Sequence, residues 1–196
     1  MAAPKITIIF YTTYGTNHEI AVAAQEAAEA AGAEVRLRRV AETAPQSVID
    51  SQEGWKAQQE KMKDIPEVSH DDMTWADGYF FSMPTRYGNL PSQMQAFIDT
   101  LGPLWQEGKL VNKTITATTS AQTAHGGREV TILSLYTSAM HWGAILVPPG
   151  YADAVKFEDG NPYGYSGTAG QFDEQGKKSV SFQAKRLVET TAKIAG

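Results

Sequence analysis

Apolar and polar residues follow one another along the chain in blocks that predict alternating strands and helices. Residues 5–11 are apolar and rich in β-branched side chains, as in a strand buried on both faces of a parallel sheet. Residues 17–31 carry alanine and isoleucine at helical spacing, and Gly32 follows as a stop signal. Residues 34–40 alternate as a second strand. This order indicates a doubly wound α/β fold.

The alternation continues to the end of the chain. Further strands are predicted at residues 75–82, 113–120 and 144–147, and further helices at residues 90–101, 129–142 and 179–195. The second of these helices is expected to bury Ile132, Leu133, Tyr136 and Met140. Five strands joined by helices predict a flavodoxin-like α/β fold, a five-stranded parallel sheet with the strand order 2-1-3-4-5.

Two segments interrupt the alternation. Residues 43–70 are polar, contain prolines and show no sustained period, so we interpret them as an excursion from the sheet. Val48, Ile49 and Trp55 are its candidate anchors. Residues 148–176 are rich in glycine, proline and aromatic side chains, and are too long for a simple connection. We expect a functional or interfacial role for this loop, and a single domain for the 196 residues.

Composition and charge narrow the classes of function. A net charge of −5 argues against a nucleic-acid partner, because phosphate contacts need an electropositive face. The absence of cysteine excludes disulfides, zinc–thiolate sites and thiol nucleophiles. No apolar run approaches the roughly 20 residues that a membrane-spanning helix needs, and no signal peptide is recognisable. We therefore expect a cytoplasmic protein without membrane insertion or a metal site.

Three loops are predicted at strand ends, where open parallel sheets bind ligands. The first, residues 12–17, reads Thr-Thr-Tyr-Gly-Thr-Asn and leads from a strand into a helix. Backbone N–H groups at a helix start, together with threonine hydroxyls, can bind a phosphate. With one glycine and no lysine, the loop is neither a P-loop nor a dinucleotide fingerprint. It suits a phosphate monoester such as flavin mononucleotide (FMN); the alternative is a plain turn with a threonine cap.

The other two loops contain features that suit a flat ring. In residues 83–91, Pro84 and Gly88 would fix an irregular backbone that can offer N–H groups to ring heteroatoms. Arg86 could place positive charge near a reduced, anionic ring, or could pair with a neighbouring carboxylate at the surface. Residues 119–129 contain a Gly-Gly pair among polar residues, which allows a ligand to approach the backbone closely.

These loops also carry a resemblance to a known family. The sequences Thr-Tyr-Gly, Pro-Thr-Arg-Tyr-Gly-Asn and His-Gly-Gly-Arg-Glu, in this order and spacing, resemble the WrbA family of flavodoxin-like, FMN-dependent NAD(P)H:quinone oxidoreductases. So does Asn-Pro-Tyr-Gly at residues 161–164, and the Pro-Thr-Arg-Tyr-Gly-Asn loop at residues 84–89 is the most specific part. The chain departs from the family pattern at Thr12, where serine is usual, and at Thr16 and Asn17.

The resemblance implies FMN as cofactor, NADH or NADPH as electron donor, quinones as acceptors, and a homotetramer with sites lined by more than one subunit. It implies that the FMN phosphate contacts Thr12, Thr13, Tyr14, Gly15, Thr16 and Asn17. It implies that the ring lies against Pro84, Thr85, Arg86, Tyr87, Gly88 and Asn89. It implies that further ring and ribityl contacts come from Ser120, Ala121, Gln122, Thr123, Ala124 and Gly126. Arg86, Trp105 and His141 would lie at the exposed face of the flavin as the catalytic residues.

Considered one at a time, two of the candidate catalytic residues each have an alternative role. Trp105 either seals a helix end or forms one wall of a slot for flat rings. His141 is either a residue of a helix end or a group that donates a hydrogen bond or proton to a quinone oxygen. For the whole chain, we expect two-electron reduction of quinones through a ping-pong hydride transfer. The alternatives are a flavodoxin-type one-electron carrier and a non-enzymatic, FMN-dependent scaffold or regulator.

Overall fold

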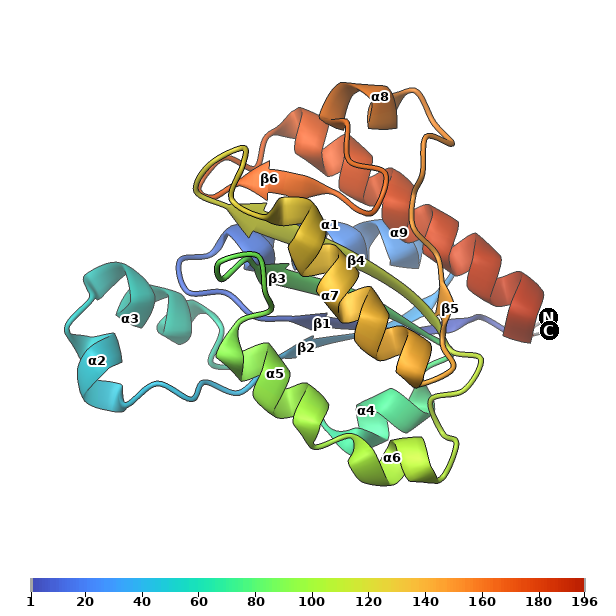
Figure 1. The fold of residues 1–196 in the computed structure, drawn as a ribbon, viewed down its shortest axis with the longest axis horizontal. Coiled ribbons are helices and arrows are strands. Elements are labelled where there is room, and N and C mark those ends of the chain that lie inside the picture. Colours follow the sequence, from blue (N-terminus) through green and yellow to red (C-terminus); the bar gives the residue numbers. More distant parts are fainter. Residues whose placement is uncertain (1, 196) are drawn as a thin grey trace.

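The structure, a computed structural model, describes residues 2–195. Its parallel sheet has the strand order β2-β1-β3-β4-β5, which confirms the predicted flavodoxin-like topology (Figure 1). The strands are β1 (Lys5–Phe10), β2 (Glu34–Arg39), β3 (Gly78–Pro84), β4 (Thr114–Ala121) and β5 (Ile145–Leu146). A sixth strand, β6 (Ser166–Thr168), was not predicted; it pairs in parallel with the end of β4.

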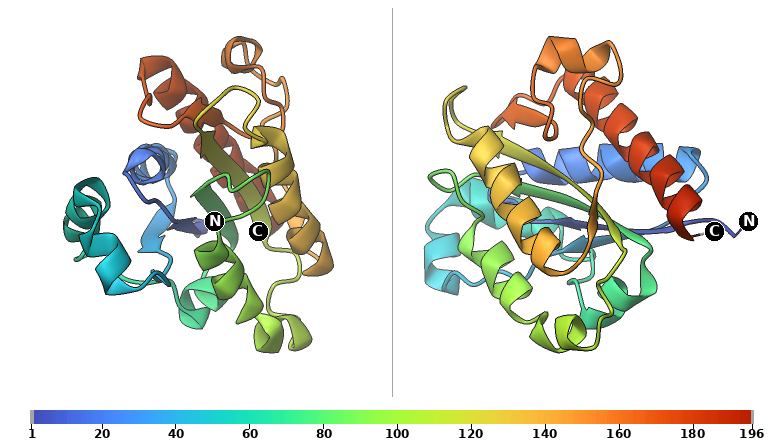
Figure 2. Two further views of the ribbon diagram at one scale, coloured as in Figure 1. Left: turned by 60° about the vertical axis from the view of Figure 1, so that its left-hand side comes forward. Right: turned by 45° about the vertical axis from the view of Figure 1, so that its right-hand side comes forward.

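Helices cover both faces of the sheet. They are α1 (Thr16–Ala30), α2 (Gln46–Asp50), α3 (Glu53–Lys61), α4 (His70–Trp75), α5 (Ser92–Asp99), α6 (Gly102–Gln106), α7 (Arg128–His141), α8 (Val155–Asp159) and α9 (Glu174–Ala195). The turned views in Figure 2 show α1 and α9 on one face of the sheet, and α5 and α7 on the other. Within the described chain, no helix is long and apolar enough to cross a membrane.

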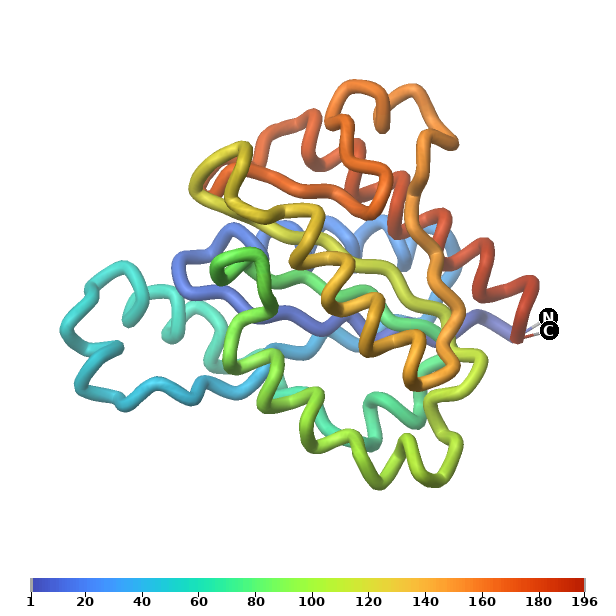
Figure 3. Tube along the Cα trace, viewed as in Figure 1, coloured from blue at the N-terminus to red at the C-terminus, as the bar shows by residue number. Residues whose placement is uncertain are grey.

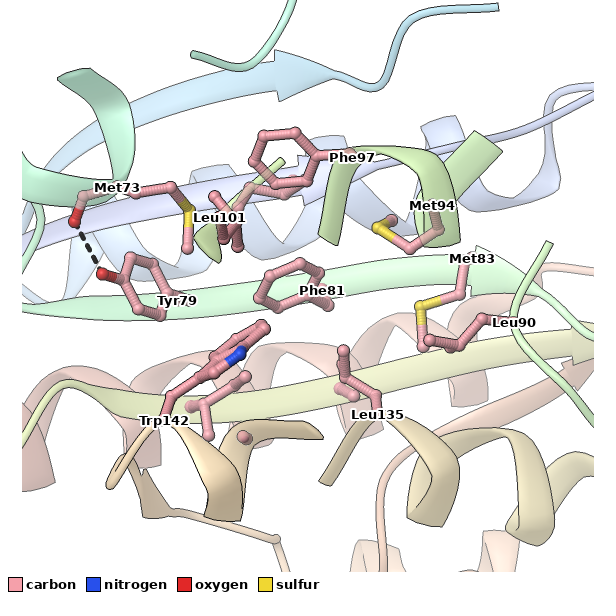
Figure 4. Packing of buried hydrophobic residues seen from close by; sticks show 14 of the residues in the cluster. Met73, Tyr79, Phe81, Met83, Leu90, Met94, Phe97, Leu101, Leu135 and Trp142 are labelled. Atoms are coloured by element: carbon pink, nitrogen blue, oxygen red, sulfur yellow. Dashed lines mark hydrogen bonds between the residues drawn. The ribbon is translucent and has the colours of Figure 1, made fainter. Parts of the chain in front are cut away.

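Strand β1 is buried on both faces, as its apolar sequence predicts. Ile8 and Phe10 pack with α1 and α9 on one side of the sheet. Ile9 and Tyr11 point to the opposite side and join the core under α5 and α7. Successive side chains of a strand point to opposite faces, so a strand covered on both sides needs a nearly continuous apolar run; the hydroxyl of the buried Thr7 is satisfied by a hydrogen bond to the carbonyl of Asp72. Figure 4 shows the second core, where Tyr79 donates a 2.6 Å hydrogen bond to the carbonyl of Met73.

The excursion at residues 43–70 contains the short helices α2 and α3. Figure 3 shows the chain leaving the sheet after β2, passing through these two helices and returning before α4. Ile49 and Trp55 are 4% and 9% exposed, as predicted for anchors, whereas Val48 is 41% exposed. The prediction missed the helices because each is short and polar, so neither shows a sustained apolar period.

Two predicted segments differ in ways that the packing explains. Trp75 was predicted to begin the third strand, but it ends α4, which starts with a capping box between Ser69 and Asp72. Helix α7 buries Ile132 and Tyr136 as predicted, but Leu133 and Met140 are exposed. Apolar side chains lie on two sides of α7, so their spacing alone did not identify the side that faces the sheet.

The loop at residues 148–176 is attached to the rest of the fold by buried polar contacts. Lys156 of α8 is fully buried, and its Nζ lies 2.6 Å from Oδ2 of Asp159 and 3.2 Å from Oγ of Ser179 on α9. Gln183 of α9 accepts a hydrogen bond from the backbone N–H of Tyr165. These contacts hold the loop against α9 and bring β6 to the edge of β4.

Gly164 provides a test of this close packing. A Cβ atom at residue 164 would lie 1.9 Å from the carbonyl oxygen of Ala117 in β4. Gly164→Ala is therefore expected to destabilise the protein by about 1–3 kcal/mol, the usual cost of overpacking, measured by urea denaturation. Gly102→Ala is the control, because a Cβ there meets nothing within 4 Å. Equal denaturation midpoints for the two variants would contradict close packing of Gly164 against β4.

Candidate functional site

A cavity of about 770 Å³ opens at the carboxyl ends of β1, β3 and β4. This volume is in the range of small-molecule sites, and the position is where the strand order reverses. The structure brings the three predicted loops together at the carboxyl ends of these strands, which lie at the left of the sheet in Figure 1. The predicted residues that line the cavity are Thr12, Thr13, Tyr14, Thr16, Asn17, Pro84, Thr85, Arg86, Tyr87, Gly88, Ser120, Ala121, Gln122, Thr123 and Gly126.

The first loop ends in Gly15, which has φ +108° and serves as the N-cap of α1 without a side-chain cap. The first N–H groups of a helix have no intrahelical partner, and the helix dipole favours an anion there. Around them, the hydroxyl of Thr12 accepts a 3.0 Å hydrogen bond from the N–H of Gly15. The hydroxyl of Thr16 accepts one of 2.8 Å from the N–H of Gly170. Each hydroxyl therefore keeps its own proton for a ligand oxygen.

Asn17, at the start of α1, connects this helix to two strand ends. Its side chain is 1% exposed, its Nδ2 donates to Oγ of Ser120 at 2.8 Å, and its Oδ1 accepts from Oγ of Ser82 at 3.3 Å. Ser82 belongs to β3 and Ser120 to β4. The amide of Asn17 thus fixes the start of α1 against both neighbouring strands.

The second loop makes a tight turn. Arg86 and Asn89 exchange two backbone hydrogen bonds of 2.9 Å. Between them, Tyr87 and Gly88 have φ values of +54° and +81°, as in a type I′ turn. The turn holds the ring of Tyr87 in full exposure. It thereby gives the rim of the cavity a rigid backbone with an aromatic side chain on the outside.

Arg86 joins the first and second loops. Its Nη2 donates to Oγ1 of Thr13 at 2.9 Å, and its Nη1 donates to the carbonyl of Thr85. Among the ion pairs of residues 2–195, none includes Arg86, so the carboxylate partner considered from the sequence is not present. The guanidinium places its charge at the cavity wall.

The third loop packs against the second without room for side chains. A Cβ at Gly127 would lie 2.6 Å from Cα of Gly88, and Gly127 has φ +80°. Thr85 donates to the carbonyl of Gly126 at 3.2 Å and accepts from the hydroxyl of Thr131 at 2.7 Å. Gly127 is also the N-cap of α7, again without a side-chain cap. A second helix N-terminus therefore opens at the cavity.

Some predicted residues lie elsewhere. Gly15, Asn89 and Ala124 belong to the same loops but do not line the cavity. Trp105 and His141 lie together, because the indole Nε1 donates to the carbonyl of His141 at 2.9 Å. His141 is the last residue of α7, whose 14 residues span about 20 Å from the cavity end, and Trp105 lies beside it on α6. Within one copy, the structure does not bring these two side chains to the cavity.

Two lining residues, Val130 and Ala169, lie outside the predicted loops, whereas His125 and Gly127 belong to the predicted third loop without having been assigned contacts of their own. Val130 directly follows that loop. Ala169 follows β6, and its N–H donates to the carbonyl of Ala121 at 2.8 Å. A strand of three residues has no recognisable period, so only the proximity of β6 to β4 places Ala169 at the site.

Comparison with known proteins identifies relatives over the full length of the chain. A curated relative from Deinococcus radiodurans, named NAD(P)H dehydrogenase (quinone), is 56% identical over the full length of both chains. A protein of the same name from Geotalea uraniireducens is 38% identical, covering 97% of this chain and 99% of that protein. Among solved structures, a WrbA-like flavodoxin from Agrobacterium tumefaciens superposes with a TM-score of 0.71 at 15% identity, covering 98% of this chain and 99% of that one.

The model of the NADPH-dependent FMN reductase family matches residues 4–159. With this match and the full-length relatives, the chain belongs to the NADPH-dependent FMN reductase family.

Proposed function

We propose that the protein carries FMN and uses NADH or NADPH to reduce quinones by two electrons. The observation that carries this proposal is the cavity in which two uncapped helix N-termini and a hydroxyl-rich loop meet a rigid turn. The names of the relatives support the donor and the acceptor, and the family supports the flavin.

The first loop fits the phosphate monoester of FMN. The N–H groups at the start of α1 would donate to its oxygens, and the protons of Thr12 and Thr16 would complete the contacts. Residues 12–17 contain no lysine, so the loop offers dipoles and hydroxyls and no cationic side chain of its own. Asn17 would act as a positioning residue, because its amide is engaged with Ser82 and Ser120.

The second and third loops fit the ring. The turn at Tyr87 and Gly88 would present backbone groups to the ring edge, while Gly126 and Gly127 allow close approach from the other loop. Arg86 would stabilise negative charge at this edge. The chemistry that FMN would supply when bound is the transfer of a hydride from reduced nicotinamide to a quinone. Donor and quinone would bind in turn at the same face, which gives ping-pong kinetics.

The proposal includes a homotetramer in which another copy completes the site. Val130, Leu133 and Met140 form an exposed apolar stripe along α7, and Trp105 lies near its end with 57% exposure. Exposed apolar patches of this kind mark interaction surfaces. Because Trp105 and His141 lie far from their own cavity, they would contact a flavin only in a neighbouring subunit. There the indole would cover the ring, and the imidazole would donate a hydrogen bond to a quinone oxygen.

Steady-state kinetics test the proposed reaction. The purified protein, loaded with FMN and supplied with NADH and benzoquinone, is expected to give parallel lines in double-reciprocal plots, as ping-pong exchange requires. Intersecting lines would show that donor and quinone bind together and would contradict the shared face. Negligible NADH oxidation by the flavin-loaded protein would favour the carrier or scaffold alternatives.

Gly15→Val tests the phosphate loop. The added side chain meets a left-handed backbone, and its Cβ would lie 2.9 Å from Oε1 of Gln58. We expect FMN affinity to fall at least tenfold, equivalent to about 1.4 kcal/mol, measured by quenching of flavin fluorescence. Gly32→Val is the matched control, because Gly32 has a similar φ of +91° but lies beyond the other end of α1. Equal losses in both variants would indicate general backbone strain.

A complementation experiment tests whether Trp105 acts from another subunit. Trp105→Ala is expected to retain FMN but lose about tenfold in kcat/KM for quinone, equivalent to about 1.4 kcal/mol. Gly15→Val is expected to have little activity when free FMN is kept well below the Kd of this variant, because most of its sites then lack FMN. Mixed oligomers of the two variants would contain flavin sites that face an intact Trp105, so activity should exceed the sum of the separate variants. No gain on mixing, with subunit exchange verified by mass, would contradict the shared site.

A further inference from the structure

A second cavity, of about 560 Å³, lies beside the flavin cavity. Thr13, Tyr14 and Arg86 line both cavities, so the two are adjacent and share these side chains as a wall. The remaining wall comes mainly from the starts of α3 and α5, including Trp55 and Gln93. The excursion at residues 43–70 therefore forms one side of this second cavity, which the phosphate and ring contacts proposed above do not use.

Glu42 fixes the wall of the second cavity. Its Oε2 accepts hydrogen bonds from the phenol of Tyr11 at 3.0 Å and the indole of Trp55 at 3.2 Å. Its Oε1 accepts from Nε2 of Gln93 at 2.7 Å and from the backbone N–H of Thr43 at 2.9 Å. One carboxylate thus ties the end of β1, helix α3 and helix α5 together. A cavity with walls fixed in this way is suited to a defined ligand.

The lining combines aromatic faces with amides. The ring of Tyr14 is 61% exposed, and its hydroxyl donates to Oε1 of Gln52, which holds the ring in place. In residues 2–195, no hydrogen bond involves Nε2 of Gln52, so this amide can donate to a ligand. Aromatic faces stack on flat heterocycles, and amides bind the donors and acceptors at their edges. This chemistry suits a purine better than the aliphatic tail of a quinone.

Arg86 stands on the wall between the two cavities. Its guanidinium donates to Thr13 and to the carbonyl of Thr85, and it has no carboxylate partner among the described residues. An arginine with unused N–H groups is a strong ligand for phosphate oxygens. If a molecule placed one ring in each cavity, the segment that joins its two rings would lie beside this side chain.

We propose that the second cavity binds the adenosine part of the nicotinamide nucleotide, while its nicotinamide enters the flavin cavity and Arg86 contacts the joining diphosphate. This inference rests on the proposed function, because it names where the remote half of the same donor is bound. Binding energy from a remote part of a substrate can orient its reacting end. In this arrangement, residues 43–70 contact the adenosine half of the donor and do not contact the flavin.

Two measurements test this inference on the FMN-loaded protein. The first is a titration with ADP, followed by intrinsic tryptophan fluorescence, which needs no turnover. The second compares KM for NADH with KM for reduced nicotinamide mononucleotide, which lacks the adenosine half. Gln52→Ala removes the amide, and Ser92→Leu places a larger side chain at an exposed position of the cavity rim. Gln46→Ala, in α2 of the same excursion, is the control.

Both variants are expected to lower ADP affinity at least fivefold and to raise KM for NADH similarly, with KM for the mononucleotide and FMN affinity unchanged. The control should match the wild type. Failure of ADP to bind the wild type, or equal changes in KM for both donors, would overturn the inference. Absence of NADH oxidation in the wild type would instead contradict the proposed function, and the ADP titration would still decide whether the second cavity binds the adenosine half.

Discussion

The site depends on one buried side chain, Asn17, that holds the start of α1 against the ends of β3 and β4. Its amide is almost fully removed from water, so each of its polar atoms needs a partner, and Ser82 and Ser120 supply them. A shift of α1 against either of these strand ends would leave one of these groups unpaired, at a cost of about 1–3 kcal/mol. The cavity therefore keeps its shape because the loops around it are anchored to a hydrogen-bonded network beneath them.

The same requirement explains the composition of β4. All eight of its residues are buried, yet it contains many threonines and few large apolar side chains. The hydroxyls are satisfied within the fold: that of Thr119 donates to the carbonyl of Met83 at 2.8 Å, and that of Thr116 accepts from Nε2 of Gln183 at 2.8 Å. Small β-branched side chains leave room for α9 and the late loop to approach β4 closely. That approach positions β6 and the far wall of the cavity.

Helix α7 connects two regions with different roles. Its first turn borders the cavity, and its last turn carries His141 beside Trp105. Because the helix is rigid, the distance between these regions is fixed within one copy. Leu133 and Met140 on the exposed apolar side of α7 were predicted to be buried, and this prediction is wrong for one copy, because no element within residues 2–195 covers them. Their proposed cover is a second copy.

The sequence by itself determined the strand order, the position of the three loops and the family, all of which are confirmed. The roles of individual residues in binding FMN stay predictions. The fold can be predicted from local periodicity because the spacing of apolar residues within each strand or helix reflects which of its faces is buried. Only the tertiary structure decided which distant groups meet: Asn17 with Ser120, separated by 103 positions, and Thr16 with Gly170, separated by 154. It also decided that Glu42 would build a second cavity and that Trp105 and His141 would lie away from the first. Such contacts depend on how elements pack, and no local pattern of residues encodes that packing.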